Sequence, residues 1–294
     1  LSTDMRSTWL TQAFSGLIPA LALFATDIGY GWVAFSPLGM QHAHWGIVAA
    51  FMAATVGSIV PALVGGTGPM PSGARPAQTL IYASLLLGLV GSGADLSISL
   101  ISGAVCVVLA GMLQLGMGLI GLGQAIKYTP MPVLAGFTNG VALSMVLAAG
   151  QMLFVSHGSG PDASLDLGGL PGKLGFMFFL LVLMSTIYRL DRRIHWSLIG
   201  LVAGIALYQV ASHLGQAHWL GRTLPDTSSL HPAFPVFSLA PSDLQAAVGQ
   251  LPFSELLPAA LSIAVLNSLE ALVIASQHDL YEGTRHNSNR VLLG

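Results

Sequence analysis

The sequence predicts an all-α polytopic membrane protein, and three observations support that fold class. Only 7% of the 294 residues are charged, whereas roughly a quarter are charged in an ordinary soluble domain. Hydrophobic residues make up 53% of the chain and gather in uncharged stretches long enough to cross a bilayer. The 35 glycines and 16 prolines lie mostly within these apolar stretches, as transmembrane helices tolerate.

The spans follow from length, because a transmembrane helix needs about 20 apolar residues and lipid offers no hydrogen-bond partner to bare backbone. About eight spans are expected, over residues 13–35, 44–64, 74–91, 99–121, 132–154, 174–190, 196–213 and 255–276. Two of them are irregular. The first contains Asp27, and the third follows a run of glycine and proline over residues 65–73. We therefore expect a half-helix near residues 72–91 that starts part-way through the membrane.

Positive charges give the orientation, because Lys and Arg accumulate in cytoplasmic loops. They lie at alternate ends of the spans, at Lys127, at Arg189, Arg192 and Arg193, and at Arg285 and Arg290. This places the N-terminus in the cytoplasm and residues 214–254 in an extracytoplasmic loop. The expected location is a bacterial inner (plasma) membrane, which the chain crosses several times.

Several classes of function have little support. The formal charge of -2 leaves no basic surplus to hold nucleic acid, so no nucleic-acid partner is expected. Cys106 is the single cysteine, and His42 and His44 form an i, i+2 pair that is weak evidence for a metal. The glycine pattern at residues 116–121 ends an apolar span and follows no strand, so close helix packing explains it better than a nucleotide. We expect no cofactor, no metal and no enzyme activity.

Two carboxylates, Asp27 and Glu270, are expected well inside spans. A charge at that depth costs several kcal/mol, so such residues usually face a cavity, pair with another group, or carry ions or protons. Asn267 lies one turn before Glu270 and Ser268 lies beside it, which gathers polar groups on part of an otherwise apolar helix and favours a functional role for Glu270. Asp27 would instead lie near the interface if its helix breaks at Gly29.

Arg75 is the cation that the sequence places inside the membrane region, at the start of the third, Gly/Pro-broken helix. Unsatisfied backbone N–H groups and the positive end of the helix dipole would lie beside it, and this combination attracts anions. Gln78 and Thr79 on the next turn would add neutral donors. Two alternatives stay open: Arg75 snorkels from the end of a full span, or it simply pairs with Asp27 or Glu270.

Two segments resemble the SulP (sulfate permease) family of anion transporters. Residues 127–143, KYTPMPVLAGFTNGVAL, are similar to the family's I-P-x-P-V-x-x-G-F-x-x-G-x-x-L pattern at its fifth span. The residues SLEAL at 268–272 and TRHNSNR at 284–290 resemble its eighth span and the R-H-x-x-N-x-E-L-x-G-Q-G continuation. With the Ser72-Gly73 start of the third span, the resemblance covers nearly the whole chain.

The resemblance implies a fold of seven-plus-seven inverted repeats. This chain would supply the first inverted repeat of about seven spans and the first span of the second repeat. Its expected parts are core-domain spans one to four over 1–130, gate-domain spans five to seven over 131–213, the loop 214–254, and core span eight with the start of the next segment over 255–294. The sequence looks cut off after residue 294, before the family's tenth span, its second gate segment and the cytoplasmic STAS domain that often follows, and whether the native protein has these parts stays open.

The resemblance also implies secondary active transport of a small inorganic anion, such as sulfate or bicarbonate, by an elevator-like movement of core against gate. Family members bind the anion between the third and tenth half-helices, with contributions from the first and eighth spans. The expected substrate-binding residues here are Ser72, Gly73, Ala74, Arg75, Thr26 and Asp27. Glu270 matches the coupling carboxylate of some members, so proton symport is expected, with sodium the weaker choice. A homodimer is expected as well.

Departures from the family pattern leave the substrate open. Thr26 and Asp27 stand where many members have Gln and a small neutral residue, and Arg75 stands where Pro or Thr is common. Asp27 is expected to pair with Arg75 when the site is empty. Two other functions remain: an anion channel or voltage-responsive protein on the same scaffold, and a membrane-embedded enzyme or structural subunit. An enzyme would need a nucleophile or metal cluster at one depth.

Overall fold

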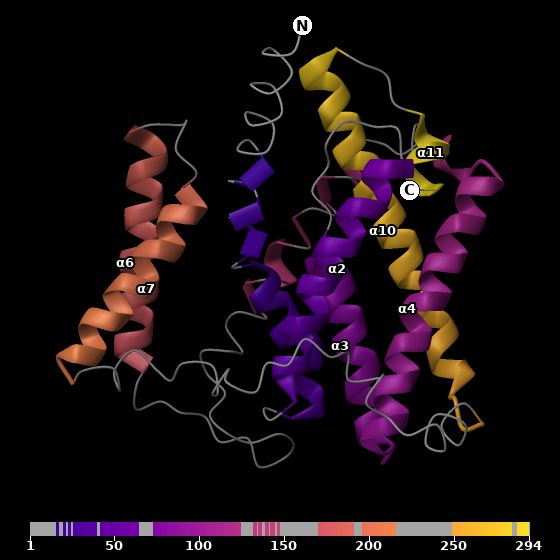
Figure 1. Cartoon of the computed structure of the whole chain (residues 1–294), viewed down its shortest axis with the longest axis horizontal. Helices are drawn as coiled ribbons and strands as arrows, with labels where there is room; N and C mark the ends of the chain where they lie inside the picture. Colours follow the sequence, from indigo (N-terminus) through magenta and orange to yellow (C-terminus); the bar gives the residue numbers. More distant parts are fainter. Residues whose placement is uncertain are drawn as a thin grey trace, which may run out of the picture. The chain divides into compact units, whose positions relative to one another are not determined.

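The computed structural model describes residues 16–17, 20–21, 23–24, 26–39, 42–64, 73–124, 132–133, 135–136, 139–140, 142–144, 146–147, 170–190, 196–215, 249–283 and 287–293. Over these residues the regular elements are helices (Figure 1), which confirms the all-α class. The chain divides into two compact units. The smaller unit comprises Leu1–Thr26 and Ala149–Thr227, and the larger unit comprises Asp27–Ala148 and Ser228–Gly294.

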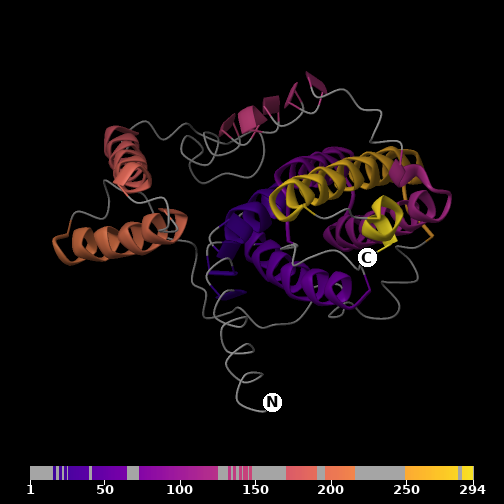
Figure 2. The same cartoon turned by 90° about the horizontal axis from the view of Figure 1, so that it is seen from above.

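The larger unit contains the residues with candidate chemistry. Its helices are residues 27–35, η1 (Ser36–Leu38), α2 (Ala43–Val64), α3 (Pro76–Gly91), α4 (Leu96–Leu119), α10 (Phe253–Glu282) and α11 (Ser288–Leu293). The long helix α10 packs along both α3 and α4, most extensively along α4 (Figure 2). Segments far apart in the sequence therefore meet along α10.

Where the spans are fully described, the helices match the predicted spans to within about four residues, except that α10 continues to Glu282, six residues beyond the predicted end. Leu96–Leu119, Leu170–Arg189 and Phe253–Ser276 are long and apolar enough to cross a membrane, and His44–Ile59, Pro76–Gly91 and Ile199–His213 are shorter apolar helices. The 16 residues of α3 extend about 24 Å, less than the roughly 30 Å of a bilayer core. The helix is thus shorter than a full span, and the half-helix that begins inside the membrane stays a prediction. Part of span 13–35, about half of span 132–154 and most of the loop 214–254 lie outside the described residues.

Residues 27–35 and α2 cross in backbone contact. A Cβ atom added at Gly31 would meet the carbonyl of Gly46, and one added at Gly46 would meet the carbonyl of Gly31. Small residues allow membrane helices to approach this closely. Trp32 and Ile47, beside the two glycines, are buried together. The crossing fixes the helix that carries Asp27.

The interface of α4 with α10 is built mainly from small side chains. Cys106 and Ala110 on α4 and Ala260 and Ala264 on α10 are buried in one cluster with Leu256. Small residues at such an interface let the two backbones approach, and van der Waals packing then holds the helices together. The position and rotation of α10, and so of Glu270, are set by this packing.

Glycines also serve as contact points at the end of α4 and in the smaller unit. A Cβ at Gly118 would meet Leu292 and Leu293 of α11, so the glycine pattern at 116–121 includes a helix-packing site, as expected. In the smaller unit, α6 (Leu170–Leu190) packs on α7 (Trp196–His213), where a Cβ at Gly200 would lie 2.6 Å from the Met184 sulfur.

Candidate functional site

The start of α3 is set by its local sequence. Pro76 occupies the first turn of the helix, where its missing N–H costs nothing and its fixed φ suits the helix. A proline disfavours the helical conformation of the residue before it, and Arg75 is extended at φ -122° and ψ 149°. The residues Gly73 and Ala74 before it are also non-helical. The irregular segment therefore continues through Arg75, and α3 begins two residues after the predicted start of the span at residue 74.

Thr79 closes the first turn of α3 on the carbonyl of Arg75. Its backbone N–H and its hydroxyl both donate to that oxygen, at 2.9 Å and 2.7 Å. Helix geometry provides no intrahelical acceptor for the N–H groups of Ala77 and Gln78. These N–H groups and the helix dipole give the start of α3 a positive potential that adds to the charge of Arg75.

Glu270 of α10 lies against the start of α3. Its Oε2 atom is 3.8 Å from Arg75 Nε and accepts a hydrogen bond of 3.1 Å from Gln78 Nε2. The two charged side chains are only 27% and 13% exposed. The sequence left open a pairing of Arg75 with Asp27 or Glu270, and the structure contains the pair with Glu270. The pair joins the two residues to which the sequence assigns anion binding and ion coupling.

Asp27 lies close to the same place. Its side chain is 3% exposed, and a Cβ atom added at Gly73 would lie 3.2 Å from its Oδ1. Any side chain at position 73 would therefore crowd the Asp27 carboxylate, and glycine avoids this contact. Tyr30, one turn further along the helix, interacts electrostatically with Asp27, Arg75 and Glu270 together. One cation and two carboxylates thus surround Tyr30, with a net charge of -1 when all three are ionised.

The other predicted site residues take different places. Asn267 lies one turn before Glu270 on α10. Its side chain donates a hydrogen bond of 2.7 Å to Gln114, and so points toward α4. Thr26 belongs to the smaller unit, is exposed, and donates its hydroxyl to the carbonyl of Leu23 at 2.7 Å. Ala74 is half-buried in the extended segment. Ser72 lies outside the described residues.

Two participants were not anticipated from the sequence. Tyr30 follows Asp27 by three residues, a spacing that places both on one face of a helix and could have revealed it. Gln114 is an isolated amide within the apolar span over 99–121 and needs a partner in lipid, but the sequence does not say which. Its contact with Asn267 depends on the packing of α10 against α4.

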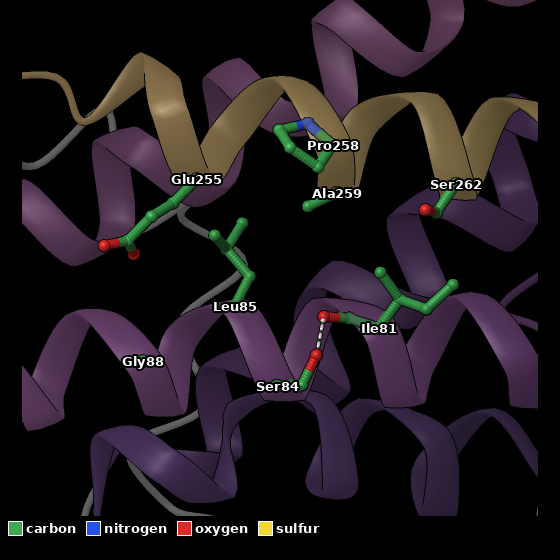
Figure 3. A pocket seen from close by; sticks show the side chains of 8 residues that line it. All are labelled: Ile81, Ser84, Leu85, Gly88, Glu255, Pro258, Ala259 and Ser262. Atoms are coloured by element: carbon green, nitrogen blue, oxygen red, sulfur yellow. Dashed lines mark hydrogen bonds between the residues drawn. The ribbon is translucent and has the colours of Figure 1, made fainter.

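A separate groove runs between later turns of α3 and the start of α10 (Figure 3). It encloses about 420 Å³ and is lined by Ile81, Ser84, Leu85, Gly88, Glu255, Pro258, Ala259 and Ser262. Its ionisable group is the carboxylate of Glu255, while Ser84 turns back to the carbonyl of Ile81 at 2.8 Å. An acidic wall does not favour an anion, so this groove is not a candidate anion site.

The described part of the chain contains no cluster of side chains that could hold a metal ion. There, His, Cys, Asp and Glu residues do not gather in groups of three or more. The ring of His42 stacks on Trp45 with centroids 4.5 Å apart, and His44 meets the same ring at 5.6 Å. Burial lowers the pKa of His42, and the nearby His44 lowers it further.

Comparison with known proteins identifies the family. The profile of the sulfate permease family matches residues 11–161, which is more than half of the chain. The chain belongs to this family. The predicted resemblance is thereby confirmed, and with it a multi-pass membrane protein. The family is one of permeases, which agrees with the expectation that the chain is not an enzyme.

Two similarities extend over most of the chain. The bicarbonate transporter BicA of a Picosynechococcus species is 23% identical over 290 residues, which are 96% of this chain and 48% of BicA. The solved transmembrane domain of a cyanobacterium bicarbonate transporter BicA matches with a TM-score of 0.61 and 19% identity, over 92% of this chain and 69% of that domain. The fold is thus of the BicA type, and the chain spans about half the length of its curated relative.

Proposed function

We propose that the full-length protein is a secondary active carrier of a small inorganic anion, with bicarbonate and sulfate the first candidates. The observation that carries this proposal is the ion pair between Arg75 and Glu270 at the N-terminus of α3. Membership of the sulfate permease family and the similarity to a bicarbonate transporter, BicA, support the class of substrate.

Arg75 would bind the anion, assisted by the backbone of Ser72, Gly73 and Ala74 and by the positive end of α3. Helix N-termini stabilise anions through their free N–H groups and dipole, and a guanidinium matches a planar oxyanion in two hydrogen bonds. In the structure, the carboxylate of Glu270 is the anion that pairs with Arg75. A substrate anion would replace Glu270 as the partner of Arg75.

The charges around Arg75 favour proton coupling. With Asp27 and Glu270 ionised, the three groups carry a net charge of -1, and a further anion would be repelled. Protonation of Glu270 brings that sum to zero, which makes room for one anion. We therefore propose proton-anion symport.

The remaining features follow the family pattern. We propose seven-plus-seven repeats, with core spans over 1–130 and 255–294 that move as an elevator against the gate spans over 131–213. In partial support, α6 and α7 belong to one compact unit and α2, α3, α4 and α10 to the other, although residues 1–26 group with the former and residues 131–148 with the latter. A homodimer in a bacterial inner membrane with a cytoplasmic N-terminus and an extracytoplasmic 214–254 loop completes the proposal.

Uptake by the full-length protein in proteoliposomes tests this function. Labelled bicarbonate and sulfate should accumulate under an inward proton gradient, and Arg75→Ala should abolish that uptake. Ser84→Ala is the matched control, because this exposed hydroxyl on the same helix bonds only to its own backbone among described partners. Undiminished uptake by Arg75→Ala would exclude the proposed site. Currents far above carrier turnover would favour the channel alternative.

A further inference from the structure

We infer that Gln78 couples anion binding at Arg75 to protonation of Glu270, by exchanging the partners of its side-chain amide. This inference rests on the proposed anion carrier and goes beyond it, because it assigns the coupling to a neutral residue. Gln78 lies one turn into α3, with Glu270 facing it from α10.

Of the two polar atoms of the Gln78 amide, only the nitrogen has a hydrogen-bond partner among the described residues. Its Nε2 donates to Glu270 Oε2 at 3.1 Å, and an ionised carboxylate can only accept, so the NH₂ side of the amide must face it. Its Oε1 is buried and accepts a hydrogen bond from none of the described residues. A buried acceptor without a donor is destabilising, which makes this a state that a suitable donor would improve.

The groups around Glu270 leave few candidates for that donor. Arg75 and Gln78 face it from α3, and Asp27 and Tyr30 approach from the helix of residues 27–35. The contact from α4 goes to Asn267 instead, through Gln114. On the following turns of α10, α11 contributes apolar packing by Val291 and Leu292 against Leu272 and Ala275.

Protonated Glu270 supplies the donor. A proton from the aqueous phase adds to one carboxylate oxygen, and the new O–H can donate to Gln78 Oε1 once the amide has rotated by half a turn. The rotation turns Nε2 away from Glu270 and toward the anion on Arg75, to which it donates. The amide NH₂ thus always serves the ionised partner, either Glu270 or the substrate, and Oε1 is used only when Glu270 is neutral.

The exchange makes anion affinity depend on the protonation of Glu270. Anion binding should be tighter at acidic pH, and by linkage the bound anion should favour proton uptake by the same factor. Coupling between two sites is typically about 5-fold to 150-fold in affinity. Removing the amide should reduce this factor, even though Arg75 and Glu270 both remain.

The test compares binding by the full-length protein in lipid nanodiscs at acidic and mildly alkaline pH. The probes are labelled sulfate, and labelled bicarbonate at a fixed concentration of the bicarbonate ion. Gln78→Met keeps the length of the side chain but can neither donate nor accept in the same way. We expect wild type to bind one of these anions more tightly at acidic pH, and Gln78→Met to lower that ratio at least about fivefold.

Two further variants keep the inference falsifiable. Gln78→Glu places two carboxylates that share a proton at this position, so the pH at which affinity changes should shift rather than vanish. Ser84→Ala, on the same helix, should behave as wild type. A wild-type pH dependence in both Gln78 variants would overturn the inference and leave the carrier intact. If wild type binds neither anion, the proposed function fails instead.

Discussion

Neutralising Glu270 should strengthen anion binding, because the carboxylate competes with the substrate for Arg75. At the observed separation of 3.8 Å, an effective dielectric constant of about 20 gives an attraction of about 4 kcal/mol. Partial exposure of Arg75 and the remaining charge of Asp27 reduce this gain. We expect about a third of this attraction to appear as tighter anion binding. Because about 1.4 kcal/mol corresponds to a factor of ten, Glu270→Gln should lower the Kd roughly tenfold.

The assay is equilibrium binding of labelled bicarbonate and sulfate to the full-length protein in nanodiscs at mildly alkaline pH. Glu270→Gln should also lose the pH dependence of binding and of transport. Glu255→Gln is the matched control, because this carboxylate is on the same helix but exposed in the groove of Figure 3. An unchanged or higher Kd in Glu270→Gln would refute the competition between carboxylate and substrate.

Two predictions concern the scaffold that holds the site. Gly31→Ala should lower stability in a thermal melt by about 1–3 kcal/mol, because its Cβ would strike the α2 backbone. Gly29→Ala, whose Cβ would meet nothing within 4 Å, should not, and equal effects would contradict the crossing. A double-mutant cycle with Asn267→Leu and Gln114→Leu should give a coupling of about 0.6 to 1.7 kcal/mol, and zero coupling would argue against their hydrogen bond.

Much of the fold could be predicted from the sequence because the bilayer imposes simple rules. Span length and the absence of charge located the helices, but α3 begins at Pro76 rather than at the predicted residue 74, because a proline disfavours the helical conformation at Arg75. Helix ends were less certain: α10 runs from Phe253 to Glu282, beyond the predicted 255–276, because polar residues near its end continue the helix outside the apolar stretch.

The candidate site was predicted in part, because charges in an apolar chain are few and must find one another. That argument singled out Asp27, Arg75 and Glu270. Their pairing could not be derived, since which carboxylate meets Arg75 depends on how α10 is rotated against α3. The same limit applies to Asn267. Helical spacing places it one turn from Glu270, but the packing of α10 against α4 directs its side chain toward Gln114.

Proton exchange during anion binding tests the central claim most directly. The full-length protein in a weakly buffered, mildly alkaline solution is mixed with bicarbonate-free sulfate, and then separately with bicarbonate, while a pH indicator reports proton uptake. The replacement of Glu270 by a substrate anion at Arg75 requires proton uptake in wild type and its loss in Glu270→Gln. Saturable anion binding without proton uptake, or with equal uptake in Glu270→Gln, would contradict it.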